Sequence, residues 1–233
     1  MCSLGAMHAT WDAALADLDA RLAGQSHLVM AGLAGPPGAG KSTVARQVAR
    51  ILGHRGAPAC VVPQDGFHLS HRQLDRQGLL GAKGTPPTFD VAGFVNLLRR
   101  IRALGPRDVV YVPEYDRHLH EPVAARGRVD AATRVVLVEG NYLLLDAGPW
   151  DQVRDLLDVT WYLDAPPAFR DERLLHRHTS GGRTADDART WIDTVDHANT
   201  VLIETTRDRA DFVLDTTGHI PSFRGEAFPA SHA

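Results

Sequence analysis

Runs of consecutive apolar residues alternate along the chain with stretches in which apolar residues return every three or four positions. Continuous apolar runs are typical of strands that are buried on both faces of a sheet. They occupy residues 27–33, 59–62, 109–112, 135–139, 159–163 and 212–214. The wider spacing predicts amphipathic helices, which we place at 11–24, 43–52, 90–104, 170–178 and 185–204. This alternation predicts an α/β fold, with helices on both faces of a mainly parallel sheet.

No change of composition marks a linker within the chain. We therefore expect one domain over 27–219, with the first helix, within 1–26, packed on its core. Thr10 can cap the N-terminus of that helix, and Gly24 can end it. Residues 220–233 are rich in Pro, Gly, Ser and His, and we expect a loosely ordered tail there.

Composition and charge narrow the classes of partner. Of the 233 residues 44 % are apolar, which is enough for a sizeable core. The 25 basic and 28 acidic residues give a net charge of -3, unlike the basic balance of a general nucleic-acid binder. No apolar run approaches the roughly 18 residues of a membrane span, so we expect neither nucleic acid nor membrane as partner. Cys2 and Cys60 imply no disulfide framework, which favours the reducing cytoplasm.

A glycine-rich turn after the first predicted strand carries the most specific motif. Residues 35–42 read Gly-Pro-Pro-Gly-Ala-Gly-Lys-Ser and fit the pattern G-x-x-x-x-G-K-[ST] in full. Glycines let successive N–H groups face one anion, and the following helix N-terminus adds partial positive charge. Lys41 is a point charge for the β- and γ-phosphates, and the Ser42 hydroxyl is a ligand for Mg²⁺. The residues expected to bind the nucleotide are Gly35, Pro36, Pro37, Gly38, Ala39, Gly40, Lys41, Ser42 and Thr43.

A dinucleotide-binding loop is the main rival interpretation of these glycines, and it fails on spacing. The only G-x-G is Gly38–Gly40, and Thr43 stands where the third glycine belongs. An ordinary Gly/Pro-rich loop is the other alternative, but the predicted strand before the motif and the helix after it favour a phosphate loop. The cradled phosphates therefore belong to a nucleoside triphosphate, and we expect ATP.

Two acidic residues stand at the ends of predicted strands. Asp65 follows the strand at 59–62 after a short turn, and its carboxylate should face the phosphates, where it can accept a proton from a substrate hydroxyl or hold a metal-bound water. Glu139 closes the strand at 135–139 and suits the Mg²⁺ shell or a catalytic water, because a buried acid needs a metal or a donor. The alternatives are a turn aspartate and a strand-end glutamate that reaches solvent.

Five segments then carry a resemblance to a known family. They are the loop at 35–43, DGFH at 65–68, KGTPPTFD at 83–90, PEYDR at 113–117 and VEG at 138–140. In this order they resemble the phosphoribulokinase / uridine kinase / bacterial pantothenate kinase family of P-loop kinases. The runs DGFHL at 65–69 and EGNYLLLD at 139–146, with Trp150, are most similar to a branch labelled nucleoside, nucleotide or fructose-transport-associated kinases. The resemblance implies a three-layer αβα sandwich with a small helical lid.

The resemblance also implies roles for residues around the phosphates. Asp65 matches the family's catalytic base beside the acceptor hydroxyl, and Glu139 matches the acid near Mg²⁺. Tyr115 and Arg117 match its acceptor-binding tract, although pantothenate kinases carry a histidine where Arg117 stands. A guanidinium there favours a carboxylate, a phosphate or several sugar hydroxyls. We also expect His68, close to Asp65 in the sequence, to contact the acceptor.

The predicted lid covers about residues 173–190 and contains a Ser-Gly-Gly turn at 180–182. Arg173 and Arg177 match arginines that reach the transferred phosphate or the acceptor, so we assign Arg173 to catalysis and Arg177 to ATP. A solvated basic face at a helix C-terminus is the alternative for these arginines. Asn199 matches an acceptor-binding asparagine of the pantothenate kinases.

The sequence thus predicts an ATP- and Mg²⁺-dependent kinase that phosphorylates a hydroxyl of a small molecule. A pantothenate-like, nucleoside-like or sugar-like acceptor fits equally well. The alternative is a P-loop ATP-binding regulatory module that hydrolyses ATP slowly. Similarity to the family also suggests a homodimer.

Overall fold

The computed structural model describes residues 7–24 and 27–218, and a parallel sheet forms its centre. Six strands lie in the order β1-β8-β7-β2-β6-β3, and every pairing among them is parallel. Their bounds are β1 Met7–His8, β2 Val29–Ala34, β3 Ala59–Pro63, β6 Val135–Glu139, β7 Val159–Asp164 and β8 Phe212–Asp215. Strands β2, β6 and most of β7 are fully buried, which is why they read as unbroken apolar runs.

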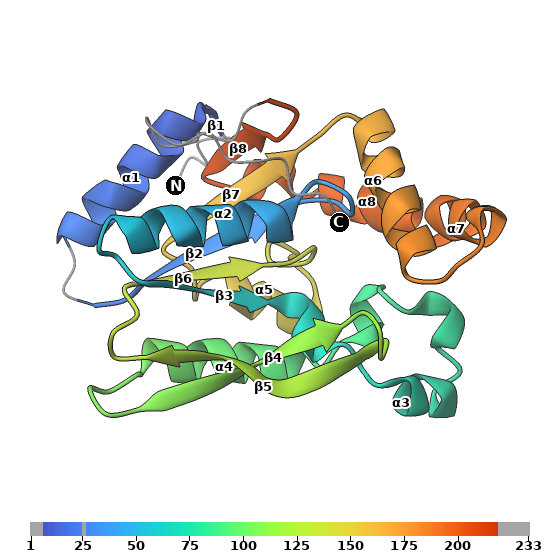
Figure 1. Ribbon diagram of the computed structural model, residues 1–233, viewed down its shortest axis with the longest axis horizontal. Coiled ribbons are helices and arrows are strands. Elements are labelled where there is room, and N and C mark those ends of the chain that lie inside the picture. The colour runs from blue at the N-terminus through green and yellow to red at the C-terminus, as the bar shows by residue number, and fades with distance from the viewer. Residues whose placement is uncertain (1–6, 25–26, 219–233) are drawn as a thin grey trace.

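Helices cover both faces of this sheet and complete a three-layer αβα sandwich (Figure 1). On one face α1 and α2 pack on β2, β6 and β7 through residues such as Leu18 and Val48. On the other face α4, α5 and α8 bury residues such as Phe94, Val153 and Ile203. The α-helices are α1 Trp11–Gly24, α2 Lys41–His54, α3 His71–Arg76, α4 Val91–Arg102, α5 Asp151–Arg154, α6 Pro167–Ser180, α7 Ala185–Trp191 and α8 His197–Glu204. Each of them is too short or too polar to cross a membrane.

Helix α1 is fixed to the sheet by its first residue as well as by its apolar face. The Trp11 ring meets the buried Trp161 ring edge-on, with 6.3 Å between centroids. Its indole Nε1 donates a hydrogen bond of 2.9 Å to the Asp215 carbonyl at the end of β8. The predicted tail at 220–233 lies outside the described residues.

The run at 109–112 does not join the parallel sheet, which corrects the sequence prediction. It begins β4, Val109–Asp116, which pairs antiparallel with β5, Glu121–Asp130, in a separate two-stranded ribbon beside β3 (Figure 1). Val110 and Val112 are buried while Tyr111 is 59 % exposed, so only one face of the ribbon is covered. Strand β5 was not predicted because its solvent-facing residues break the apolar run.

The segment predicted as a single long helix at 185–204 is interrupted. Helices α7 and α8 are joined by a π-helical turn at Ile192–Asp196, in which Ile192, Val195 and Asp196 are buried. A π turn adds one residue to the helical repeat and is not visible in a pattern of period 3.6. Single 3-10 turns occur at Gln64–Phe67, Leu80–Ala82, Pro86–Thr88, Gly148–Trp150 and Arg207–Arg209.

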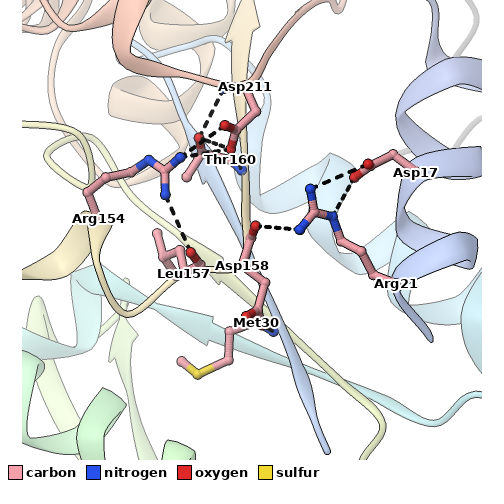
Figure 2. A network of polar contacts seen from close by, with 8 residues as sticks. All are labelled: Asp17, Arg21, Met30, Arg154, Leu157, Asp158, Thr160 and Asp211. Carbon is pink, nitrogen blue, oxygen red and sulfur yellow. Dashed lines mark hydrogen bonds and ion pairs between the residues drawn. The ribbon is translucent and has the colours of Figure 1, made fainter. Parts of the chain in front are cut away.

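A polar network fastens the strands at their N-terminal ends, opposite the glycine-rich loop (Figure 2). The Asp211 carboxylate accepts two hydrogen bonds of 3.0 Å from Arg154 and two more from the amide and hydroxyl of Thr160. Asp158 accepts a bond of 2.7 Å from the Met30 amide, and its carbonyl accepts one of 2.8 Å from Arg21 of α1. The network joins β2, β7, α1 and the loops before β7 and β8.

Candidate active site

The order of the strands brings the predicted site residues to one edge of the sheet. Strand β6 lies between β2 and β3, and its last residue, Glu139, is in register with Leu33 and Pro63. The glycine-rich loop follows β2, and Asp65 follows β3. Glu139 therefore ends between the phosphate loop and Asp65, as expected where parallel strands terminate together.

The loop at 35–40 needs its glycines for its shape. Gly35, Gly38 and Gly40 have φ values of +144°, +77° and +89°, which side chains rarely tolerate. A Cβ at Gly35 would lie 2.4 Å from the Leu163 carbonyl oxygen, and one at Gly38 would lie 2.6 Å from that of Arg170. Left-handed residues alternating with ordinary ones form an anion-binding concavity of backbone amides.

Lys41 is the first residue of α2 and bridges this loop. Its Nζ donates hydrogen bonds of 2.8 Å and 2.9 Å to the carbonyl oxygens of Gly35 and Pro36. Burial lowers the pKa of Lys41 to about 8, against the opposing attraction of Glu139 and Asp65. The side chain is only 8 % exposed, so this ammonium is fixed at the loop and can offer its third N–H to a phosphate.

Ser42 and Glu139 form a pair of oxygen ligands beside Lys41. Ser42 Oγ donates a hydrogen bond of 2.9 Å to Glu139 Oε1. Burial, followed by the charge of Asp65, raises the pKa of Glu139 to about 7. A hydroxyl and a buried carboxylate are hard oxygen donors, and Mg²⁺ in kinases takes few protein ligands together with phosphate oxygens. The two residues therefore fit a Mg²⁺ ion, whose charge would offset the cost of burying the carboxylate.

Asp65 lies at the same edge of the sheet, just after β3. It is the second residue of the 3-10 turn at Gln64–Phe67, and its charge raises the pKa of both Lys41 and Glu139. The next residue, Gly66, packs so tightly on the ribbon that a Cβ there would lie 2.2 Å from the Pro113 carbonyl oxygen. This contact fixes the Asp65 turn against β4.

His68 and Tyr115 meet beside Asp65. The His68 ring lies 5.1 Å from that of Tyr115 and 4.1 Å from that of Phe89, and its Nδ1 is 2.9 Å from the Asp65 carbonyl oxygen. Burial lowers the pKa of His68, which favours a neutral imidazole. Burial and the charge of Asp65 raise the pKa of Tyr115 to about 12. Lys83 Nζ lies 5.1 Å from the centre of the Tyr115 ring.

The two arginines of the predicted lid, Arg173 and Arg177, lie on α6. Arg173 donates a hydrogen bond of 3.2 Å to the Gly38 carbonyl and another of 3.3 Å to that of Thr216. Arg177 lies close enough to Lys41 for its charge to lower the pKa of that ammonium. Its guanidinium Nη2 is 3.7 Å from Asp196 Oδ1.

Arg117 and Asn199 occupy different settings. Arg117 is exposed near the tip of the ribbon, and its charge acts on Tyr115; within the described ranges its guanidinium has no hydrogen bond or ion pair. Asn199 is 4 % exposed, and its Nδ2 donates a hydrogen bond of 3.2 Å to the Gly84 carbonyl. Its amide thus holds the 83–90 segment in this structure, and an acceptor contact by Asn199 stays a prediction.

Buried polar residues that the sequence analysis did not single out also support this edge. Gln64 is fully buried and accepts a hydrogen bond of 3.0 Å from the Tyr142 amide. The Tyr142 hydroxyl donates one of 2.6 Å to the Gly84 carbonyl, the same oxygen that Asn199 contacts. Asp196, on the π turn, is a third such residue. Of these three residues, only Tyr142 lies in a motif that the sequence analysis used. Gln64 and Asp196 gave no signal, because a single buried polar side chain does not change the periodic pattern of apolar residues.

Comparison with known proteins agrees with this geometry. The sequence profile described as "Phosphoribulokinase / Uridine kinase family" matches residues 30–220, which include the loop, both acids and the lid. The chain belongs to this family. The predicted family, α/β P-loop fold, enzyme class and cofactors are therefore confirmed: it is a small-molecule kinase that uses ATP with Mg²⁺.

The chain is similar to relatives with different names. A Schizosaccharomyces pombe protein provisionally named a uridine kinase is 34 % identical over 194 residues, 80 % of this chain and 82 % of that protein. A pantothenate kinase from Enterococcus faecalis is 29 % identical over 149 residues, 63 % of this chain and 48 % of that protein. The crystal structure of a protein provisionally named a fructose transport system kinase, from Silicibacter sp. TM1040, superposes with a TM-score of 0.77. It is 37 % identical and covers 87 % of this chain and 96 % of its own.

Proposed function

We propose that this kinase transfers the γ-phosphate of ATP to a hydroxyl of a small molecule bound between the phosphate loop and the β4–β5 ribbon. The proposal rests chiefly on Asp65, which follows β3 where Glu139 ends and precedes Gly66, the residue that packs on Pro113 of the ribbon. The charge of Asp65 also shifts the pKa values of Lys41 and Glu139 and of His68 and Tyr115. A general base must lie between the nucleotide and the acceptor, and the position of Asp65 between the β3 end and the ribbon supports that role.

Each side chain then has one task in the transfer. Asp65 takes the proton of the acceptor hydroxyl as its oxygen bonds to the γ-phosphorus, and the bond to the β–γ bridging oxygen breaks to release ADP. Lys41 offsets negative charge on the β- and γ-phosphates, and Arg173 and Arg177 approach the transferred group from the lid.

Ser42 and Glu139 are the residues that would hold Mg²⁺, which when bound neutralises charge on the phosphate oxygens. Glu139 also keeps the Ser42 hydroxyl oriented through their 2.9 Å hydrogen bond. We assign the amides of residues 35–43 to the phosphates.

The acceptor is proposed to contact His68, Tyr115, Arg117 and Asn199. Similarity to proteins named uridine kinase and pantothenate kinase leaves nucleoside-like, pantothenate-like and sugar-like acceptors as candidates. Arg117 has no carboxylate partner within the part of the chain that the structure describes, so it can receive a group from the acceptor. A carboxylate, a phosphate or several hydroxyls would match a guanidinium.

We further propose that residues 27–219 act as one kinase domain whose lid, at about 173–190, closes over ATP. The helix at Trp11–Gly24 is then an attachment to the core and not a separate domain. A homodimer and a cytoplasmic location stay predictions.

Release of ADP with and without a panel of acceptors tests the proposed function against a slowly hydrolysing regulatory module. The panel contains pantothenate, uridine, fructose and D-glycerate, and mass spectrometry detects the gain of one phosphate. Stimulation by one acceptor, with matching product, supports the kinase. Equal background hydrolysis with every compound, at concentrations well above those of cellular metabolites, supports the module.

A further inference from the structure

Asp196 is a buried carboxylate for which the proposed roles give no task. It ends the π turn at Ile192–Asp196, and its side chain is 7 % exposed. Burying a charged carboxylate is costly unless other charges or donors compensate it. The groups that compensate Asp196 therefore indicate what it does.

Two consecutive residues of the lid helix α6 meet the two oxygens of Asp196. Arg177 Nη2 lies 3.7 Å from Oδ1, and His178 Nε2 lies 2.8 Å from Oδ2. The first distance suits an ion pair but is too long for a hydrogen bond. Asp196 therefore holds the Arg177 guanidinium by charge while its N–H groups stay available for another partner; among the described residues none of them forms a hydrogen bond.

The pair lies next to the phosphate loop. The charge of Arg177 lowers the pKa of Lys41, and the charge of Asp196 raises it. Two further carboxylates, Glu139 and Asp65, also raise the pKa of this ammonium. Arg183, from the turn after α6, also faces Asp196 and Arg177, with its guanidinium 3.8 Å over the Trp191 ring. Arg173, four positions before Arg177 on the same helix, donates a hydrogen bond to the Gly38 carbonyl of the loop. This face of α6 therefore lies against the phosphate loop, and Arg177 continues it while paired with Asp196.

The π turn explains how the chain brings Asp196 to this position. The extra residue rotates the segment after Trp191, so that Asp196 and Asn199, three positions apart on one face, both point inward. Asp196 contacts the lid helix, and Asn199 contacts Gly84 of the 83–90 segment. One helical face therefore joins the lid to the segment next to the proposed acceptor site.

We propose that Asp196 is a positioning residue, which holds the Arg177 guanidinium toward the phosphate loop so that it meets the phosphoryl group in transfer. The inference rests on the proposed phosphotransfer at this site. Asp196 itself touches neither nucleotide nor acceptor. Without its charge, Arg177 is free to turn toward solvent, and stabilisation of the transition state is lost while ADP binding is kept.

Calorimetry tests this without an identified acceptor. Affinity for ADP with Mg²⁺ is compared with affinity for the same mixture plus aluminium fluoride, which mimics the transferring phosphoryl group. The wild type should bind the mimic more tightly than ADP alone. Asp196→Asn should weaken mimic binding by about tenfold to a hundredfold, the range for a charge-assisted contact, with ADP affinity and melting temperature nearly unchanged.

Three further variants separate positioning from helix packing. Arg177→Gln should show the same loss, and the double variant Asp196→Asn/Arg177→Gln should be no worse than Arg177→Gln alone. His178→Gln removes the other partner of Asp196 and should retain mimic affinity. If Asp196→Asn does not fold, Asp196→Asn/Arg177→Met replaces it, because neither member of the ion pair is then left charged without its partner, and Arg177→Met is its reference.

The outcomes are distinct. Three results would each overturn the role of Asp196 and leave the kinase assignment intact. Asp196→Asn could bind the mimic as tightly as the wild type, or His178→Gln could lose as much affinity as Asp196→Asn. The double variant could also lose more affinity than Arg177→Gln alone, which would mean that the two residues act independently. A wild type that binds ADP but shows no tightening with the mimic would overturn the proposed phosphotransfer, and the role of Asp196 with it.

Discussion

Ser42 Oγ donates a hydrogen bond of 2.9 Å to Glu139 Oε1, although 97 positions separate the two residues. The parallel pairing of β2 with β6 produces this contact, because it places Leu33 opposite Glu139 just before the phosphate loop begins. The glutamate is held in a buried position where its ionisation is unfavourable. A carboxylate in this state is suited to a cation and is costly without one.

Protonation of Glu139 should therefore make the stability of the metal-free protein depend on pH. Its pKa is raised from 4.5 to about 7, so the folded state binds more protons than the unfolded state between these values. Stability should fall as the pH rises through this window, by up to about 3 kcal/mol. Lys41, with its pKa lowered to about 8, stays charged over most of it. Urea unfolding in chelator from pH 5 to 7.5 measures the change.

Glu139→Gln should flatten that pH dependence and increase stability at the upper end of the window, because it removes the ionising group. Glu172→Gln changes an exposed glutamate of α6 and should keep the wild-type slope. Equal slopes in wild type and Glu139→Gln would show that another group carries the effect.

Gly66→Ala should disturb the site through the backbone. Its Cβ would lie 2.2 Å from the Pro113 carbonyl oxygen, so either the Asp65 turn or β4 must move. We expect a loss of about 1–3 kcal/mol in unfolding free energy and a reduced kcat. Gly53→Ala is the matched control, because no atom lies within 4 Å of its added Cβ and the position is helical. That change should be neutral or stabilising by about 0.5–1 kcal/mol; similar losses in both variants would contradict the steric account.

The network at the opposite end of the strands should affect stability and not nucleotide binding (Figure 2). Asp211→Asn weakens the contacts with Arg154 and Thr160 and should lower unfolding free energy by about 1–3 kcal/mol. Affinity for ATP with Mg²⁺ should stay unchanged, as measured by calorimetry below the melting transition. Asp208→Asn, at a side chain that is 84 % exposed, is the control and should change neither quantity. A stable Asp211→Asn with weakened ATP binding would contradict this separation.

Arg117 should set the preference for a charged acceptor. Acceptors are compared in pairs that differ in one anionic group: pantothenate with panthenol, glycerate with glycerol, fructose 6-phosphate with fructose. If Arg117 binds that group, kcat/KM should favour the anionic member, and Arg117→Gln should reduce the preference by about tenfold to a hundredfold. Arg117→Lys should recover part of it, since charge returns without the planar fork. Arg100→Gln, at an exposed arginine of α4, should leave it unchanged. A preference unaffected by Arg117→Gln would assign recognition to other residues.

Local patterns in the sequence predicted much of this molecule because the relevant physics is local. The strands that include Val135–Glu139 are buried on both faces, and the loop at 35–42 needs glycines at fixed spacing. Strand β5 and the π turn were not predictable in this way. Strand β5 is mostly exposed or half-buried and so lacks an apolar run, and the π turn places Asp196 against α6 through a contact between separate segments, which no local pattern shows. The Gly84 carbonyl, shared by Tyr142 and Asn199, depends on three segments that meet only in the folded chain.

The central claim is that Asp65 is the general base, and Asp65→Asn tests it most directly. Binding of ATP with Mg²⁺ is measured by calorimetry, and transfer to the acceptor found in the panel is measured in a single turnover. We expect ATP affinity within about threefold of wild type and a transfer rate lowered by about 10²–10⁴-fold, the usual contribution of a general base. Lys41→Ala, by contrast, should weaken both. A single-turnover rate in Asp65→Asn equal to that of the wild type would contradict the account.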